Sequence, residues 1–308
     1  MSSAASRLLL AAAAMIALPF AAPSQEQALR RTFQQGSVEN YRVEVTLRAE
    51  LHGVKTETIG AKTYVHPFTR EAEGNLRWTA SRRVERLDAT AGAAEITESL
   101  EGVAGDCPSA IEKEAEAVAL SPTIQPFCDE WKPPRVLRYR ETNDGLLRAL
   151  DEASLGVTKA GCPLLDLWSR HALRPNAILP AGALRIGARE EKKTPVHLPG
   201  MSPGESSEVI EWLAAPHGAA VRLHVTQQVA LDRPAQDRSG SGGFRRLEWD
   251  RFFAESLSTL STLDGGLIDA TRSASCETSY TDAPVEGLNE PPKFSFKLSL
   301  TVTIHRAP

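Results

Sequence analysis

The chain has 308 residues, of which 42% are hydrophobic and 24% are charged, and its formal net charge is -4. This composition is that of an ordinary globular protein, and the length suits one large domain or two modest ones. Because there is neither a basic surplus nor an acidic tail, we expect no nucleic-acid partner.

The first 24 residues have the pattern of a secretory signal peptide. Arg7 precedes the apolar run 8–22, which is too short and too poorly flanked for a good membrane span. Ala22-Pro23-Ser24 fits a small-x-small cleavage site, so the mature chain is predicted to begin at Gln25. We expect export to the periplasm or the extracellular space, with no transmembrane span after cleavage; an uncleaved N-terminal anchor is the alternative.

Two segments alternate strictly between apolar and polar residues, as half-buried antiparallel strands do. Residues 41–51 place Tyr41, Val43 and Val45 against Arg42 and Glu44, and residues 294–305 repeat the pattern. Shorter strands are predicted at 55–65, 75–88, 93–100, 135–141, 146–150, 209–213, 219–231, 244–254 and 266–275. The predicted fold class is therefore mainly β, with antiparallel sheets that are curved or paired in a sandwich.

Helices are expected at only two places. Ser109 and Glu112 form a capping box, which predicts a short helix near 109–120 that ends before Pro122. A second helix is predicted to begin at Pro163 and to stop before Pro175. Its apolar stripe indicates packing against a core rather than a lipid-binding face.

The four cysteines are Cys107, Cys128, Cys162 and Cys276, and all lie after the signal segment. An even number of cysteines in an oxidising compartment predicts two disulfides, for which three pairings exist. We favour Cys107–Cys128, which closes a local loop and leaves Cys162–Cys276. No C-x-x-C motif supports a redox or zinc site, and buried free thiols are the alternative if the chain is not exported.

A faint internal repeat divides the chain. Gly-Ala-Ala occurs at 92–94 and 218–220, and the Asp-Gly turn at 144–145 is echoed at 264–265. We therefore predict a first β-rich unit at 25–154, a helical connection at 155–180 and a second, related unit at 181–308. Chance matching of short glycine-containing strings is the alternative.

The β-rich layout, the D-G-x-L turns and the stretch LPAGALRIG at 179–187 resemble a group of secreted β-rich bacterial proteins of unknown function. In that group a Leu-Pro element and a glycine-containing strand open the second half. This chain has Ala188-Arg189-Glu190 where an aromatic residue is expected. The resemblance extends over about residues 41–308 and implies a fold, but no activity.

The stretch GMSPG at 200–204 matches the G-x-S-x-G pattern of serine hydrolases, with Ser202 as the nucleophile. The pattern works through a strand that enters the turn, a helix that leaves it, and the N–H of the residue after the serine. Here that residue is Pro203, which has no N–H, and loss of one oxyanion donor costs about 3–4 kcal/mol. We therefore interpret Ser202 as part of a surface connection and predict no catalytic residue.

No other pattern in the chain indicates a catalytic or cofactor site. The seven histidines show no tight metal-ligand spacing, no phosphate-binding loop occurs, and a carboxylate pair for glycosidase chemistry cannot be identified from sequence. The five tryptophans are expected to pack in the core rather than to line a glycan surface. We predict neither a metal nor a cofactor.

Three functional hypotheses remain. The leading one is a non-catalytic envelope or extracellular protein that binds another protein or an amphiphilic ligand. The alternatives are a secreted hydrolase with dispersed catalytic residues and a periplasmic carrier of lipid or another amphiphile. An apolar cavity within the β units would favour the carrier.

Overall fold

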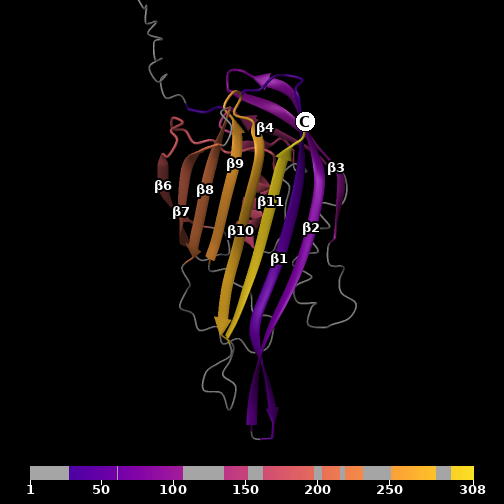
Figure 1. Cartoon of the computed structure of the whole chain (residues 1–308), viewed down its shortest axis with the longest axis vertical. Coiled ribbons are helices and arrows are strands. Elements are labelled where there is room, and N and C mark those ends of the chain that lie inside the picture. The colour runs from indigo at the N-terminus through magenta and orange to yellow at the C-terminus, as the bar shows by residue number, and fades with distance from the viewer. Residues whose placement is uncertain are drawn as a thin grey trace, which may run out of the picture.

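The fold is one open antiparallel sheet of eleven strands with a helix against one face (Figure 1). The structure is a computed structural model that describes residues 28–60, 62–106, 135–151, 162–197, 203–215, 219–231, 251–281 and 293–308. The strands are β1 (Val38–Ile59), β2 (Lys62–Asp88), β3 (Ala93–Asp106), β4 (Arg135–Thr142), β5 (Leu147–Ala149), β6 (Arg189–Val196), β7 (Gly204–Ala214), β8 (Ala220–Leu231), β9 (Arg251–Ser261), β10 (Leu267–Thr281) and β11 (Lys293–Arg306). The helix is α2 (Pro163–Ala172). No helix in these ranges is long and apolar enough to cross a membrane.

The strand order places the first and last strands side by side at the centre. The order is β5-β4-β3-β2-β1-β11-β10-β9-β8-β7-β6. Strands β1–β5 lie in the first predicted unit and β6–β11 in the second, and the pairing of β1 with β11 joins them into one sheet. The mainly β, antiparallel prediction is confirmed, whereas the origin of the two halves by duplication stays a prediction.

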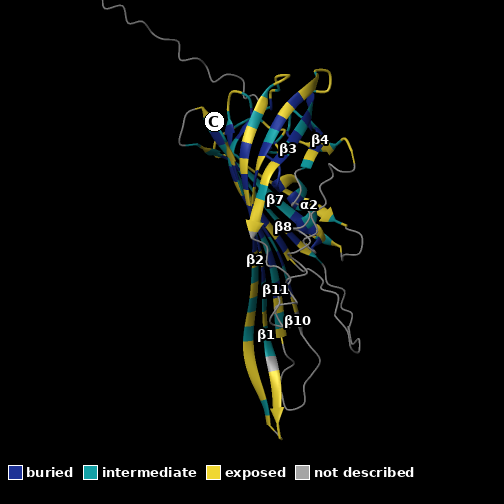
Figure 2. Ribbon diagram, turned by 90° about the vertical axis from the view of Figure 1, so that its right-hand side faces the viewer, coloured by how far each residue is buried: buried dark blue, intermediate teal, exposed yellow. Residues whose placement is uncertain are grey.

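The sheet buries one face. In β1 the odd-numbered residues Tyr41, Val43 and Val45 are at most 2% exposed, while Arg42 and Glu44 are exposed. The pairing register continues this buried face onto the neighbouring strands, because Val45 lies opposite Leu76 on β2 and Val302 on β11. Figure 2 shows the alternation of buried and exposed positions and places α2 on one side of the sheet. We call the side that carries these buried residues the inner face.

The segment before β1 holds two distant hairpin turns together. The Arg31 N–H donates to the Asn143 carbonyl at 2.7 Å, and the Thr32 N–H donates to the Asp264 carbonyl at 2.8 Å. The turns are the two Asp-Gly pairs of the sequence repeat, and Gly145 and Gly265 have φ angles of 80° and 64°. Glycine adopts this left-handed conformation without the steric cost that a Cβ would add. The echoed turns therefore occupy equivalent hairpins, one in each half of the sheet.

The helix α2 forms where the sequence predicts it. Proline begins the helix at a position whose N–H would have no partner inside the helix, and Arg170 and His171 lie in the last turn, where positive charge is favourable. Leu164, Leu165 and Ala172 are buried, which agrees with the core-packing interpretation of its apolar stripe. The helix expected near 109–120 lies outside the described residues.

One strand prediction is wrong. Residues 55–65 were expected to form one strand, but they form a hairpin, because Gly60 turns the chain with φ at 63° between β1 and β2. No strand was predicted at 189–196, where the segment is charged and contains a proline, yet these residues form β6. This strand lies at the edge of the sheet and is almost wholly exposed, which is where charge and proline are tolerated.

The central register predicts which substitutions destabilise the fold. Leu300 is fully buried and lies opposite Leu47 and Ala274. We expect Leu300→Ala to lower the free energy of unfolding by about 2–5 kcal/mol, because it leaves a cavity at the junction of the two halves. Urea denaturation measures this loss. Thr301→Ala, on the exposed face next to it, is the control and should change stability by less than about 0.5 kcal/mol; equal losses would contradict the assignment.

Candidate binding groove

A disulfide fixes the N-terminal end of α2 to the inner face. Cys162, the residue before the helix, is bonded to Cys276 on β10, and both are fully buried. This confirms one of the two predicted pairs. Cys107 and Cys128 lie outside the described residues, so their pairing stays a prediction. The cross-link joins positions 114 residues apart and so connects the middle of the chain to the second half of the sheet.

A buried arginine of the same strand holds the C-terminal end of the helix. Arg272 Nη1 donates to the carbonyls of His171, Ala172 and Arg174 at 3.1, 2.9 and 2.9 Å, and Nη2 donates to the carbonyl of Asn176. The last carbonyls of a helix have no partner inside it and carry partial negative charge, so a guanidinium satisfies both needs. Burial lowers the pKa of Arg272 to about 10, which leaves the side chain charged at neutral pH.

The spacing of these two attachments matches the helix. Arg272 and Cys276 are four residues apart on β10, or about 13 Å along a strand. The ten-residue helix is about 15 Å long. The helix therefore lies along β10, antiparallel to it, with each end fixed.

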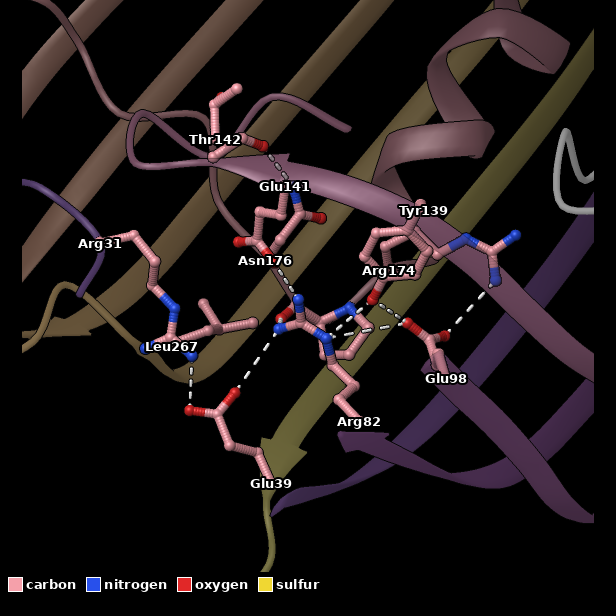
Figure 3. Close-up of polar contacts among 12 residues, drawn as sticks. Arg31, Glu39, Arg82, Glu98, Tyr139, Glu141, Thr142, Arg174, Asn176 and Leu267 are labelled. Carbon is pink, nitrogen blue, oxygen red and sulfur yellow. Dashed lines mark hydrogen bonds and ion pairs between the residues drawn. The ribbon is translucent and has the colours of Figure 1, made fainter. Parts of the chain in front are cut away.

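A second buried arginine, in the other half of the sheet, hydrogen-bonds to the segment after the helix (Figure 3). Arg82 on β2 donates from Nη1 to the Pro175 carbonyl at 2.6 Å and from Nε to the Tyr139 hydroxyl at 2.8 Å. It also forms an ion pair with Glu141 on β4. We call residues 171–180 the bridging segment, because Arg82 and Arg272 hold it from opposite halves of the sheet.

Arg82 belongs to a charge-balanced group, which we call the buried charge cluster and which consists of Arg31, Glu39, Arg82, Glu98, Glu141 and Arg174. Tyr139 donates to Glu98 at 2.6 Å, and Arg174 Nη1 lies 3.4 Å from the other Glu98 oxygen. Three arginines face three glutamates, so the cluster itself buries no net charge. Isolated buried charges would cost several kcal/mol each.

The arginines control the ionisation of Glu39. Burial by itself would raise the pKa of this carboxyl, but the positive charges of Arg31 and Arg82 outweigh burial and hold the pKa below its ordinary 4.5. Arg31 Nη2 donates to Glu39 Oε1 at 2.5 Å. Glu39 is therefore ionised throughout the neutral range.

A groove lies between α2 with its bridging segment and strands β7–β9. It encloses about 570 Å³, within the 300–1,000 Å³ usual for small-molecule sites. Leu164, Trp168 and Leu179 form one wall, and Leu223 and Phe252 form part of the other. Leu167 and Ile178, which also line the groove, are 42% and 47% exposed. The groove thus joins an apolar interior to apolar side chains that reach solvent.

Polar side chains also line part of this groove; besides those described below they include His171, Glu255, Ser256, Ser258 and Arg272. Gln227 and Glu208 lie opposite each other on β8 and β7, and Arg170 and Asn176 line the helical side. Within the described part of the chain, Arg170 Nε and Asn176 Oδ1 are buried and form no hydrogen bond. One is a donor and the other an acceptor, so a polar group of a bound molecule could satisfy either.

The serine-hydrolase pattern does not continue into a helix. Ser202 lies outside the described residues, but Gly204 begins strand β7 where a nucleophile elbow requires a helix. Among the histidines, His224 contacts Glu255 at 2.8 Å between Nε2 and Oε1, a pair that sequence analysis did not identify. His224 and Val225 are adjacent on a strand and point to opposite faces, so the imidazole lies away from the groove, whereas Glu255 is among the residues that line it. Among the described residues, no group of three or more His, Cys, Asp or Glu side chains could hold a metal ion.

The signals that sequence analysis missed were charges at inward-facing positions. Arg82 lies between Ala80 and Val84, and Arg272 lies between Ala270 and Ala274, in the apolar register of their strands. A charge at such a position needs partners inside the protein. This pattern could have identified the two attachment points, although not the carbonyls that occupy them.

No protein-family model matches the chain, and no curated protein matches it. Among solved structures, a lipovitellin from a study of lipid–protein interactions aligns at a TM-score of 0.40 and 10% identity over 90% of this chain; the chain spans about a quarter (26%) of that protein. The Salmonella secretin InvG aligns at a TM-score of 0.15 and 9% identity over 89% of this chain and 60% of that one. OccK7 of Pseudomonas aeruginosa aligns at 0.14 and 9% over 90% of this chain and 100% of that one.

The buried charge cluster predicts a large effect of removing one arginine. We expect Arg82→Met to lower the free energy of unfolding by about 3–5 kcal/mol, because it leaves buried carboxylates uncompensated. Chemical denaturation followed by circular dichroism measures this. Arg83→Met is the control, because Arg83 is exposed and its pair with Glu85 should contribute less than about 1 kcal/mol. If Arg82→Met does not fold, adding Glu141→Gln should partly restore folding; no rescue would contradict the assigned pairing.

Glu39 makes stability depend on pH in a defined direction. Its pKa in the folded protein is below 4.5, so its contribution is complete above about pH 4.5 and is lost as the pH falls through the lower, folded value. We expect Glu39→Gln to be destabilised at pH 7 and to lose less further stability than the parent between pH 4.5 and 3. Urea unfolding at several pH values tests this. Glu71→Gln, at an exposed position, should keep the parent's pH dependence.

Proposed function

We propose that this is a non-catalytic binding protein of an exported compartment, which holds an amphiphilic molecule in the groove beside α2. The observation that carries the proposal is the groove itself, with its volume of about 570 Å³ and its walls of aliphatic and aromatic side chains. Apolar walls would take up a hydrocarbon chain through the hydrophobic effect, at about 25 cal/mol per Å² of apolar surface buried.

The distribution of polar atoms supports an amphiphile over a purely apolar ligand. Arg170 Nε and Asn176 Oδ1 are buried without hydrogen bonds in the described structure, and an unsatisfied buried polar group costs about 1–3 kcal/mol. A ligand with a polar end could offset this cost while its chain contacts the walls. The disulfide and Arg272 support a groove of fixed shape, because both ends of its helical wall are attached to the sheet.

A substitution that fills the groove tests the proposal. Val225 lines the groove, and the neighbouring Thr226 points to the opposite face. We expect the parent to bind the apolar dye N-phenyl-1-naphthylamine, to release it when lysophosphatidylcholine is added, and to carry lipid in native mass spectrometry. Val225→Trp should reduce dye binding at least tenfold, because the indole occupies the groove.

Thr226→Trp is the matched control and should bind the dye as the parent does. Thermal denaturation of both variants checks that the fold is intact. Equal dye binding by both variants, with the fold preserved, would contradict a ligand in this groove. Binding of a partner protein to the parent, together with no affinity for amphiphiles, would favour an interaction protein instead.

A further inference from the structure

A two-stranded arm, formed by the continuation of β1 and β2, projects beyond the lower ends of the other strands in Figure 1. It consists of β1 residues 53–59, Gly60 and β2 residues 62–68. The pairing of β1 with β11 ends at His52 and Ser295, and that of β2 with β3 ends at Asn75 and Asp106, so among the described strands these two segments pair only with each other. Seven residues of strand extend about 23 Å.

The base of the arm is braced. The Phe68 and Phe294 rings lie 6.3 Å apart, and the Arg70 guanidinium lies 5.7 Å from the centre of the Phe68 ring. A Cβ on Gly53 would come within 2.3 Å of the Phe294 ring, so the absence of a side chain there lets the ring pack against the strand. The arm is thus supported where it leaves the sheet.

One face of the arm lacks the charged residues that the same face of β1 carries on the sheet. On the sheet, the outer face of β1 carries Arg42, Glu44, Arg48 and Glu50. Beyond His52 the same face has no ionisable residue; it carries Val54, Thr56, Thr58, Thr63, Val65 and Pro67. The ionisable residues of the arm, among them Glu57, Lys62 and His66, lie on the opposite face, so one face of the arm is free of charge.

The tip concentrates apolar side chains beside a positive charge. Ile59, Tyr64 and Val65 are 60%, 44% and 46% exposed. Ile59 and Tyr64 lie on the same face as Lys62, which is directly opposite Ile59, whereas Val65 lies on the charge-free face. Residues 53–68 hold two lysines and one glutamate, so the arm is net positive whereas the whole chain is at -4. A negatively charged surface would therefore attract the arm and repel the rest of the protein.

The size of the arm argues against a second copy as the occupant. Two strands about 10 Å wide in total and about 23 Å long present roughly 230 Å² per face. A stable protein interface needs about 800 Å² from each partner. No further described strand pairs with either edge of the arm, and open strand edges are not buried in hydrocarbon, whereas their backbone groups can hydrogen-bond in the headgroup region.

We propose that the tip of this arm docks end-on on an anionic lipid bilayer, with Ile59 and Tyr64 from one face and Val65 from the other at the headgroup boundary, and Lys62 against lipid phosphates. Tyrosine is enriched at this depth, and each basic residue near an anionic surface adds to binding. The inference does not depend on an occupied groove, because it concerns a surface at the end of the strands outside the groove.

Co-sedimentation with vesicles tests it, using the chain from Gln25 onward, which keeps every described residue. We expect binding to vesicles of phosphatidylglycerol and phosphatidylcholine in a 3:7 ratio, weaker binding to phosphatidylcholine alone, and loss of binding as salt is raised. Ile59→Asp with Val65→Asp should reduce binding at least tenfold and leave the thermal midpoint unchanged.

The matched control is Val136→Asp with Leu263→Asp, which changes two exposed aliphatic residues outside the arm and alters the net charge equally. It should bind as the parent does. Equal losses in both double variants, or no binding by the parent, would overturn the proposal. A parent dimer in sedimentation analysis that the arm variant alone dissociates would also overturn it, in favour of a second copy.

Discussion

Two buried arginines, one from each half of the sheet, bind the backbone of a single segment, and the shape of the groove depends on this. Arg272 on β10 holds the end of α2, and Arg82 on β2 holds Pro175 immediately after it. A guanidinium has five donors in a fixed geometry and can therefore bind several carbonyls at once. Without these contacts the carbonyls at the end of the helix would be buried against apolar strands with no donor. The disulfide at Cys162 then fixes the other end of the helix.

Much of the fold could be predicted because the alternation of apolar and polar residues along a strand shows directly which side chains point to the inner face and which to the outer face. The strict patterns at 41–51 and 294–305 identified β1 and β11, which proved to be neighbours. That pairing was not predictable, because alternation assigns faces but not partners. For the same reason a sandwich and a single sheet were equally consistent with the sequence. The hairpin at Gly60 was missed because threonine and valine continue on both sides of the glycine and resemble one strand.

The candidate site was predictable only at its cysteines and at the helix that begins at Pro163. An even cysteine count and the local spacing of Cys107 and Cys128 left Cys162 and Cys276 as a pair, and the second pair is present. The groove has no sequence signature, because its walls come from the apolar positions of α2 and of three strands that any core would use. Trp168 illustrates this: the sequence indicates a core residue, and the side chain packs against the core while also lining the groove.

The strongly shifted ionisable groups of this protein support its structure rather than a reaction. Shifted pKa values often mark catalytic sites, but structural networks shift them as well. Burial raises the pKa of Tyr41 to about 12 and also raises that of Tyr139 well above its ordinary value, so both phenols keep their protons at neutral pH. Both protons are used in hydrogen bonds, from Tyr139 to Glu98 and from Tyr41 to Glu39 or the Leu267 carbonyl. Each group is therefore held in one protonation state by partners it needs for folding. The groove beside α2 lies apart from both tyrosines, neither of which is among its lining residues.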